Sequence, residues 1–346
     1  MTSDVAASTS VPHTGSADGP AELPPWRAVL RWESALAVVL GLTLLYGASS
    51  SANFLNPTNF FYISLNMGEI AIMALPLTLI IMTGEIDLSV ASMLGLSATV
   101  MGSLFHAGIP LGLAIAVALA VGALGGAVNG LLIAKLGLPS IAVTIGTLTL
   151  FRGIAEIVLA PQTITGFPAS LTKIGVTPIP GTQLAYSAAI FLVLAAVCGV
   201  VLHATPLGRA LVAIGLQPEA AAFAGIRVNQ IKLALFVLSG LLSSLAGVLL
   251  ALKNASVSYD AGTGLELTVV AIVLLGGVSI FGGRGTVGGV VLSVAIVGCL
   301  QQVLTQQNVQ AEKQNIIIGL LLLVSVVIPN AAEALRRIRE RAQRST

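Results

Sequence analysis

A group of ionisable and hydroxyl side chains lies between two long apolar runs of the sequence. Residues 84–89 read GEIDLS and supply Glu85, Asp87 and Ser89, while the residues on either side are almost all hydrophobic. Carboxylates and hydroxyls can accept hydrogen bonds from a polar solute, and both can cap the first turn of a following helix. Ionisable groups beside apolar spans usually face a cavity or a pathway. We therefore expect Asp87 and Ser89 either to cap a helix or to form part of a polar pathway or its gate.

Three more ionisable residues, Glu69, Arg152 and Glu156, lie within apolar runs. Arg152 and Glu156 are four residues apart, so on a helix they share one face and we expect them to pair. Glu69 has no evident partner along the sequence, and it can meet Arg152 from another helix or face water in the pathway. The candidate pathway or gate residues are therefore Glu85, Asp87, Ser89 and Glu69.

The histidines and cysteines do not have the arrangement of a metal or redox site. His13, His106 and His203 are isolated, with no second ligand at metal-binding spacing. Cys198 and Cys299 each lie in an apolar run, which is typical of small buried hydrophobic residues. We expect no metal, no cofactor and no disulfide.

One glycine-rich segment, LLGGVSIFGGRGT, has part of the spacing of a phosphate-binding loop. Gly277 and Gly282 fit the pattern, but Gly283 and Arg284 stand where Lys and Ser or Thr are required. No Ser/His/Asp or paired-carboxylate arrangement is recognisable elsewhere. We therefore expect no catalytic residues and no enzyme, and any ATP hydrolysis would belong to partner subunits.

The composition is that of an integral membrane protein. Of the 346 residues, 56% are hydrophobic and only 9% are charged, against roughly 25% charged residues in soluble domains. The apolar runs have the length of membrane-spanning helices, whereas barrel strands would be short and alternating. The net charge of +2 is too small to indicate a nucleic-acid partner. We expect membrane lipid to surround the protein.

Ten apolar spans predict an all-α polytopic membrane helix bundle. Twelve of the 16 Lys and Arg residues fall on one side of these spans, so the positive-inside rule places both termini in the cytoplasm. The outer loops carry only Lys173, Lys253 and Lys313. The expected spans are 34–51, 59–82, 87–105, 109–134, 138–160, 184–203, 231–252, 267–282, 286–304 and 316–330.

The sequence divides into a transmembrane domain and two tails. Residues 1–32 begin with a stretch rich in Ser, Ala, Pro and Gly that lacks the basic region of a signal peptide, so we expect a disordered cytoplasmic tail. Residues 33–330 form the expected transmembrane domain, and 331–346 a basic cytoplasmic tail. The outer loop 161–183 is rich in Pro, Gly and Thr and is expected to be a structured cap.

The inner loop, about residues 204–230, contains a short predicted helix. Pro218 suits the first helical position, Glu219 lies in the turn that favours a negative charge, and Gly225 suits the residue after the helix end. The helix of about 218–224 has small side chains apart from Phe223. It could lie on the membrane surface or dock onto a cytoplasmic subunit.

This loop and two further segments resemble a known family. Glu219, Ala220 and Ala221 followed by Gly225 match the E-A-A-x-x-x-G signature of ABC importer permeases. The segments GEIDLSV and DAGTGLELTVVAIVLLGGVSIFGGRGT are similar to permeases of ribose, rhamnose and autoinducer-2 importers, and the resemblance covers about residues 34–330. The broader signature ends in I-x-L-P, whereas residues 235–238 read LFVL, so only these four residues are carried over.

The resemblance implies the permease subunit of a sugar importer in the bacterial cytoplasmic membrane. It implies a second permease, identical or not, two ATP-binding subunits and an extracytoplasmic sugar-binding protein, with the short inner helix, including Phe223, as the coupling helix. Rhamnose or autoinducer-2 is the first expected substrate, followed by ribose or another pentose. A branched-chain amino acid permease is the alternative within the same class. A passive channel or ion-coupled carrier would leave the E-A-A-x-x-x-G loop unexplained, and a membrane enzyme lacks a catalytic cluster.

Overall fold

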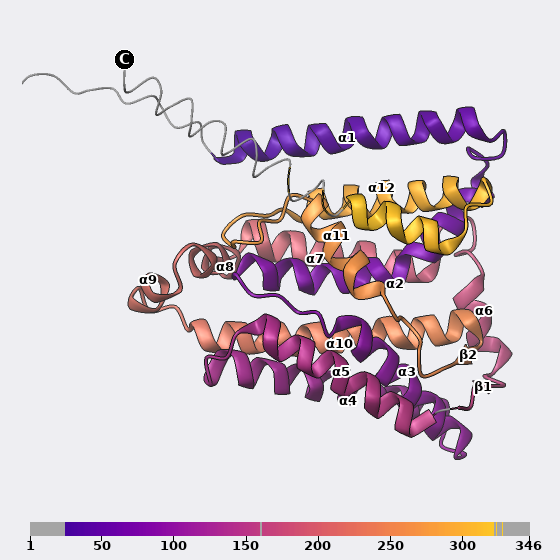
Figure 1. Cartoon of the computed structure of the whole chain (residues 1–346), viewed down its shortest axis with the longest axis horizontal. Helices are drawn as coiled ribbons and strands as arrows, with labels where there is room; N and C mark the ends of the chain where they lie inside the picture. The colour runs from indigo at the N-terminus through magenta and orange to yellow at the C-terminus, as the bar shows by residue number, and fades with distance from the viewer. Residues whose placement is uncertain (1–24, 160, 322, 324–326, 328–346) are drawn as a thin grey trace, which may run out of the picture.

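The computed structural model describes residues 25–159, 161–321, 323 and 327, which form an almost entirely helical bundle (Figure 1). The elements in chain order are α1 (Pro25–Ser50), α2 (Pro57–Met82), α3 (Val90–His106), α4 (Leu111–Gly130), the π-helix η1 (Leu131–Lys135), α5 (Ser140–Leu159), β1 (Ile164–Thr165), α6 (Ala169–Val176), α7 (Tyr186–Ala204), α8 (Pro206–Leu216), α9 (Pro218–Phe223), α10 (Val228–Asn254), β2 (Ser256–Val257), α11 (Leu265–Leu275) and α12 (Val287–Gln306).

Seven helices within the described residues are long and apolar enough to cross a membrane, and the prediction of an all-α polytopic bundle is confirmed. Helices α3 and α11 coincide with two further expected spans but have 17 and 11 residues, fewer than the roughly 20 of a full crossing. The tenth expected span, 316–330, begins in residues that are helical up to 321 and continues outside the described residues. The count of ten and the location of the termini stay predictions.

The boundary of the N-terminal tail differs from the expectation. Helix α1 begins at Pro25, so residues 25–32, which were assigned to a disordered tail, are helical. Pro25 suits the start of a helix because its missing N–H would have no partner there. Residues 1–24 and the expected basic tail 331–346 lie outside the described residues.

Helices α2 and α10 form the centre of the bundle and lie side by side in opposite directions (Figure 1). Helix α2 is almost completely enclosed, and α10 packs mainly against α4, α3 and α2. A Cβ at Gly240 of α10 would collide with the carbonyl oxygen of Gly122 in α4, so the two backbones are in direct contact. Small residues permit this close approach where lipid provides no hydrophobic drive between helices.

Each central helix is followed by a non-helical segment that leads back into the bundle. Residues 83–89 join α2 to α3, and residues 255–264 join α10 to α11. We name these segments the inner break and the outer break, following the expected orientation of the chain. Backbone without helical hydrogen bonds is tolerated at membrane depth only where protein or a cavity supplies partners, so both breaks are expected to have specific contacts.

The loop 161–183 contains regular structure, as expected of a cap. Strand β1 pairs antiparallel with β2, with Ile164 opposite Val257 and Thr165 opposite Ser256. Helix α6 packs against α10, and a Cβ at Gly175 would lie 2.7 Å from the backbone nitrogen of Lys253. The cap is therefore attached to the end of α10 and to the outer break.

Candidate functional site

The short helix predicted in the inner loop is present as α9. Pro218 occupies its start, Glu219 lies in its first turn, and Ala224 is the residue that ends it. Gly225 adopts a φ of +85°, and the N–H of Ile226 donates to the carbonyl oxygen of Ala221 at 3.0 Å. Glycine is favoured at this position because other residues are strained at positive φ. The predicted helix is therefore present, one residue shorter than expected, and Gly225 follows its end with the predicted backbone conformation.

Helix α9 projects from one end of the bundle together with α8 (Figure 1). Ala221 is buried, Glu219 and Ala220 are exposed, and the side chain of Phe223 is 94% exposed. A large aromatic side chain with almost no contact inside its own chain is available to contact another surface.

Four glycines join the inner end of the bundle to the inner break, and we name them the glycine junction: Gly84, Gly215, Gly282 and Gly283. A Cβ at Gly215, in α8, would collide with the carbonyl oxygen of Met82 and the nitrogen of Gly283. A Cβ at Gly282 would lie 2.8 Å from the oxygen of Gly215 and 3.0 Å from the nitrogen of Gly84. The N–H of Gly283 donates to the Met82 oxygen at 2.9 Å. The loop after α11, the end of α8 and the end of α2 therefore meet backbone to backbone.

Asp87 lies at the centre of a buried polar cluster in the inner break. Its Oδ1 accepts hydrogen bonds from the backbone N–H and the hydroxyl of Ser89, at 2.9 and 2.6 Å, and its Oδ2 accepts one from Ser239 of α10 at 2.8 Å. The Ser89 oxygen in turn accepts from Asn129 of α4 at 2.9 Å. Asp87, Ser89, Ser239 and Asn129 form what we name the Asp87 cluster, and each is at most 3% exposed.

The geometry of the cluster resembles a cap at the start of α3, although the side chain of Ser89 makes no capping hydrogen bond of its own. A further link comes from α5, where the Ser140 hydroxyl accepts from the N–H of Ile86 at 3.1 Å. Ser239, Asn129 and Ser140 were absent from the sequence-based candidates. Their only signal is that each is a polar residue in an apolar run, which many helix-packing positions share.

Glu85 forms an ion pair with Lys232 near the start of α10, with Glu85 Oε1 and Lys232 Nζ 2.5 Å apart. The two side chains are 17% and 12% exposed, so both are largely buried. The pair connects the inner break to α10 on the side of the expected cytoplasm.

Glu69 does not contact Arg152 but forms an ion pair with Lys253, at 2.9 Å. Its carboxylate side chain is only 3% exposed. Lys232 and Lys253 are 21 positions apart on α10, or about 30 Å at 1.5 Å per residue. Glu69 is therefore remote from Glu85, Asp87 and Ser89, it does not meet Arg152, and its place in a pathway stays a prediction.

Arg152 does not pair with Glu156 in the described structure, contrary to expectation. Its Nη1 donates to the carbonyl oxygens of Ala261 and Tyr259, at 2.8 and 3.3 Å. Glu266 and, more weakly, Asp260 attract it electrostatically, while Glu156 is exposed. The backbone carbonyls of the outer break bind the Arg152 guanidinium in place of Glu156, because this break lacks helical hydrogen bonds and its carbonyls need donors.

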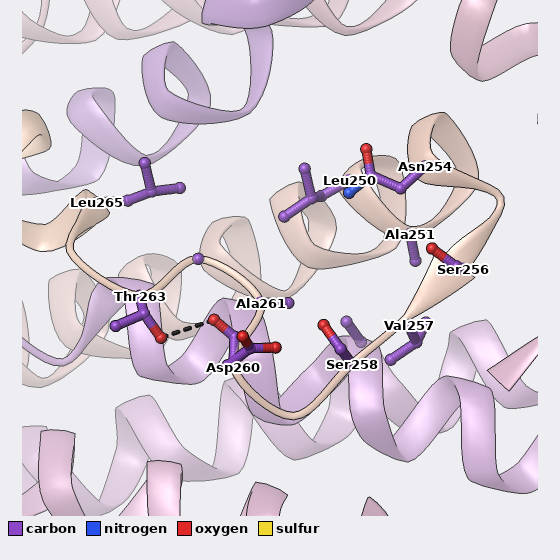
Figure 2. Close-up of a pocket in the computed structure, with 12 residues that line it drawn as sticks. Leu250, Ala251, Asn254, Ser256, Val257, Ser258, Asp260, Ala261, Thr263 and Leu265 are labelled. Carbon is purple, nitrogen blue, oxygen red and sulfur yellow. Dashed lines mark hydrogen bonds between the residues drawn. The ribbon is translucent and has the colours of Figure 1, made fainter. Parts of the chain in front are cut away.

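A cavity of about 400 Å³ adjoins the outer break (Figure 2). Its walls come from α3, from the last turns of α10 and from the break itself. Asp260 and Thr263 of the break lie along one side, with Asn254 at the end of α10 (Figure 2). The sequence did not indicate a cavity at this place.

The described residues contain no group of His, Cys, Asp or Glu that could bind a metal ion. Within that part of the chain, the arrangement therefore consists of an exposed helix, a backbone junction, a buried polar cluster and an open polar cavity. These are elements of binding and conformational change.

Comparison with known proteins identifies the family. Residues 59–326 match the family described as "Branched-chain amino acid transport system / permease component". The chain is 35% identical over 302 residues to the "Autoinducer 2 import system permease protein LsrD" of Escherichia coli strain SMS-3-5 / SECEC, of Escherichia coli strain K12 and of Shigella flexneri. Each alignment covers 86% of this chain and 91% of the relative. No solved structure matches.

Proposed function

The chain belongs to the family of branched-chain amino acid transport system permease components, and from this we propose that it is the membrane-spanning subunit of an ATP-driven importer of a monosaccharide or a sugar-like compound. It is a multi-pass protein of the inner membrane, with seven helices able to span it in the described residues. The observation that supports the proposal most is 35% identity, over nearly the whole length of both chains, to an autoinducer-2 import permease.

The substrate is proposed from the relatives. Autoinducer-2 or rhamnose comes first, followed by ribose or another pentose, because the sequence similarity is to permeases of that branch. The description of the family keeps branched-chain amino acids as the competing class. A passive channel or ion-coupled carrier is a weaker alternative, since it would leave the E-A-A-x-x-x-G loop unexplained.

The proposed complex contains a second permease, two ATP-binding subunits and an extracytoplasmic sugar-binding protein. Helix α9 would dock into a groove of the ATP-binding subunit, with Phe223 as its largest contact. A movement of α8 would displace the inner break through the glycine junction, because the backbones are in direct contact there and close-packed atoms must shift together. The Asp87 cluster would then be a gate that is closed in this conformation, because its carboxylate oxygens are hydrogen-bonded internally.

The test of the function is ATP hydrolysis by the reconstituted complex, stimulated by binding protein loaded with autoinducer-2, L-rhamnose, D-ribose or L-leucine. Stimulation and accumulation with a sugar or autoinducer-2, but not with leucine, is the expected result. Accumulation of leucine alone would assign the chain to the amino acid class. Equilibration of solute without ATP would contradict the importer.

The coupling role of α9 is tested by substitutions in it. Phe223→Ala should weaken binding of the ATP-binding subunit by about 2 kcal/mol or more if the ring fills a pocket, and Glu219→Lys should oppose the helix dipole and alter partner contacts. Phe60→Ala, an exposed phenylalanine at the opposite end of the bundle, is the control. Normal assembly and stimulated hydrolysis in both α9 variants would leave α9 as a helix that lies on the membrane surface.

Gly225 allows a sharper comparison. A Cβ there would meet nothing within 4 Å in its own chain, so within the subunit only the positive φ restricts the residue at this position. Gly225→Val should impair coupling because valine is strained at positive φ, whereas Gly225→Asn should retain it because Asn tolerates that conformation. Equal impairment by both would point to a steric contact with the partner.

The orientation is tested by single cysteines and a membrane-impermeant maleimide. Cysteines at Lys173 and Lys313 should react from outside and one at Arg209 only from inside. Reversed reactivity at these positions would place α9 on the outer face and contradict coupling to a cytoplasmic ATPase.

A further inference from the structure

The outer cavity has two unlike walls. One wall is apolar and is formed by Ala98, Leu250, Ala251, Val257 and Leu265. The other is polar and is formed by Asn254, Ser256, Ser258, Asp260 and Thr263. Its volume of about 400 Å³ is near the small end of the roughly 300–1,000 Å³ of small-molecule pockets. The cavity therefore suits a compact ligand with hydroxyls on its edge and C–H groups on its face.

The carboxylate of Asp260 is available to such a ligand. Figure 2 shows that the Thr263 hydroxyl donates to the backbone oxygen of Asp260, at 2.6 Å, and not to its carboxylate. The carboxylate makes no hydrogen bond or ion pair with the described residues, and the side chain is exposed. An ionised carboxylate only accepts hydrogen bonds, so its natural partner is a ligand with donors such as hydroxyl groups.

The polar wall is fixed in place before any ligand binds. Arg152 donates to the carbonyls of Tyr259 and Ala261, and Thr263 N–H donates to the Asp260 oxygen at 3.1 Å. The pairing of β2 with β1 holds the start of the break. Because these contacts already order the loop, binding would cost little conformational entropy.

We propose that the outer cavity is the binding site for the imported solute, a single-ring polyhydroxylated compound, with Asp260 accepting hydrogen bonds from its hydroxyls and the apolar wall covering its C–H face. This proposal rests on the proposed function and names the site at which the permease first binds the imported solute. The twelve lining residues include no Lys or Arg, and the Arg152 guanidinium beside them donates to the carbonyls of Tyr259 and Ala261. A free amino acid would offer Asp260 its ammonium instead of hydroxyls, so transport of leucine against sugar separates the two ligand classes.

Labelling of Asn254→Cys in the reconstituted complex, without binding protein, measures occupancy directly. Asn254 lines the cavity and is exposed, whereas the native Cys198 and Cys299 are buried and should react slowly. Autoinducer-2, L-rhamnose or D-ribose at about four times its Kd should slow maleimide labelling about fivefold, because roughly 80% of the sites are then occupied. Lys313→Cys, on the outer side but outside the cavity, should label at the same rate with and without sugar.

Asp260→Asn tests the acceptor in the same complex. The variant keeps the volume and removes the charge, so thermal stability should not change. A roughly tenfold weaker affinity should reduce the protection of Asn254→Cys, at the same sugar concentration, from about fivefold to about 1.4-fold, and should lower the transport rate about tenfold. Glu312→Gln removes an exposed carboxylate that does not line the cavity and should change neither.

The outcomes separate the site from the function. If sugar is transported but does not protect Asn254→Cys from labelling, the proposed site is wrong and the importer function stands. The same conclusion follows if Asp260→Asn transports sugar as fast as the unmodified protein. Transport of leucine and of no sugar would overturn both. Protection that persists in Asp260→Asn would overturn the role of Asp260 as acceptor.

Discussion

The inner and outer breaks share a four-residue pattern at the junction with the following helix, and they have opposite surroundings. The pattern is an acid, a leucine, a hydroxyl residue and a valine: Asp87-Leu88-Ser89 closes the inner break before Val90 begins α3, whereas Glu266-Leu267-Thr268-Val269 follows the outer break inside the first turns of α11. Each break follows one of the two long central helices, α2 and α10, and leads into a short one.

The two breaks differ in how their acceptors are satisfied. In the inner break, both carboxylate oxygens of Asp87 accept hydrogen bonds from within the protein, and the residue is 3% exposed. In the outer break, Asp260 faces an open cavity, and the contacts with Arg152 go to backbone carbonyls. A break of this kind is therefore structural where its polar groups have internal partners, and available to a ligand where they do not.

The largest expected effect is that of removing the carboxylate from the inner break. Asp87→Ala would leave the Ser89 N–H and the hydroxyls that donate to Asp87 without this acceptor, at about 1–3 kcal/mol for each group that stays unpaired. We expect a loss of at least about 3 kcal/mol, measured by thermal unfolding in detergent. Asp260→Ala should change stability by no more than about 0.5 kcal/mol. Equal losses would contradict the distinction between the breaks.

A conservative variant separates stability from transport at the same position. Asp87→Asn keeps the volume and can still accept from Ser89, so it should fold and assemble with the ATP-binding subunits. Because it removes the charge from the proposed gate, it should transport less solute per ATP hydrolysed. Normal transport would leave capping of α3 as a sufficient account of Asp87.

The next largest effect is expected at the glycine junction, which is present only beside the inner break. Gly215→Ala places a Cβ against the Met82 oxygen and the Gly283 nitrogen, so backbone must shift, at about 1–3 kcal/mol. We expect ATP hydrolysis that is poorly coupled to transport. Gly146→Ala, in α5 with nothing within 4 Å, is the matched control and should be neutral or stabilising. Full coupling in Gly215→Ala would remove the junction from the transmission route.

A smaller effect is expected from loosening the outer break. Arg152→Gln removes the charged donor to Tyr259 and Ala261, and since Arg152 is only partly buried the loss should be about 1–2 kcal/mol. Labelling of Asn254→Cys should become faster and its protection by sugar weaker. Glu156→Gln, which changes the partner expected from the sequence, should have no effect. If the two variants behave alike, Arg152 and Glu156 interact in the membrane after all.

The smallest effect is expected at the ion pair of the inner break. Glu85→Gln removes the charge opposite Lys232 but keeps a hydrogen-bonding amide, and because the two side chains retain only 17% and 12% exposure, we expect a loss of about 1 kcal/mol, the upper end of the range for exposed pairs. We expect near-normal unfolding temperature and transport, and little dependence of either on salt. A transport loss as large as that of Asp87→Asn would show that the whole inner break acts as the gate.

The sequence alone determined the features that depend on neighbouring residues. Hydropathy located the helices because a span needs about 20 apolar residues in a row, and Pro218 with Gly225 defined α9 because helix ends depend on local backbone conformation. Close packing of helices at small residues, as at Gly122 and Gly240, likewise depends on residue type.

Only the tertiary structure decided which polar groups meet. Glu69 pairs with Lys253, 184 positions away, and Arg152 reaches carbonyls more than 100 positions away. Spacing along one helix suggested Glu156 for Arg152, but a helix face says nothing about which distant segment lies against it. The paths of the two breaks, the hydrogen bonds of the Asp87 cluster and the outer cavity are set by the packing of α2, α3 and α10. A buried polar group takes as its partner whatever group this packing brings within hydrogen-bond distance.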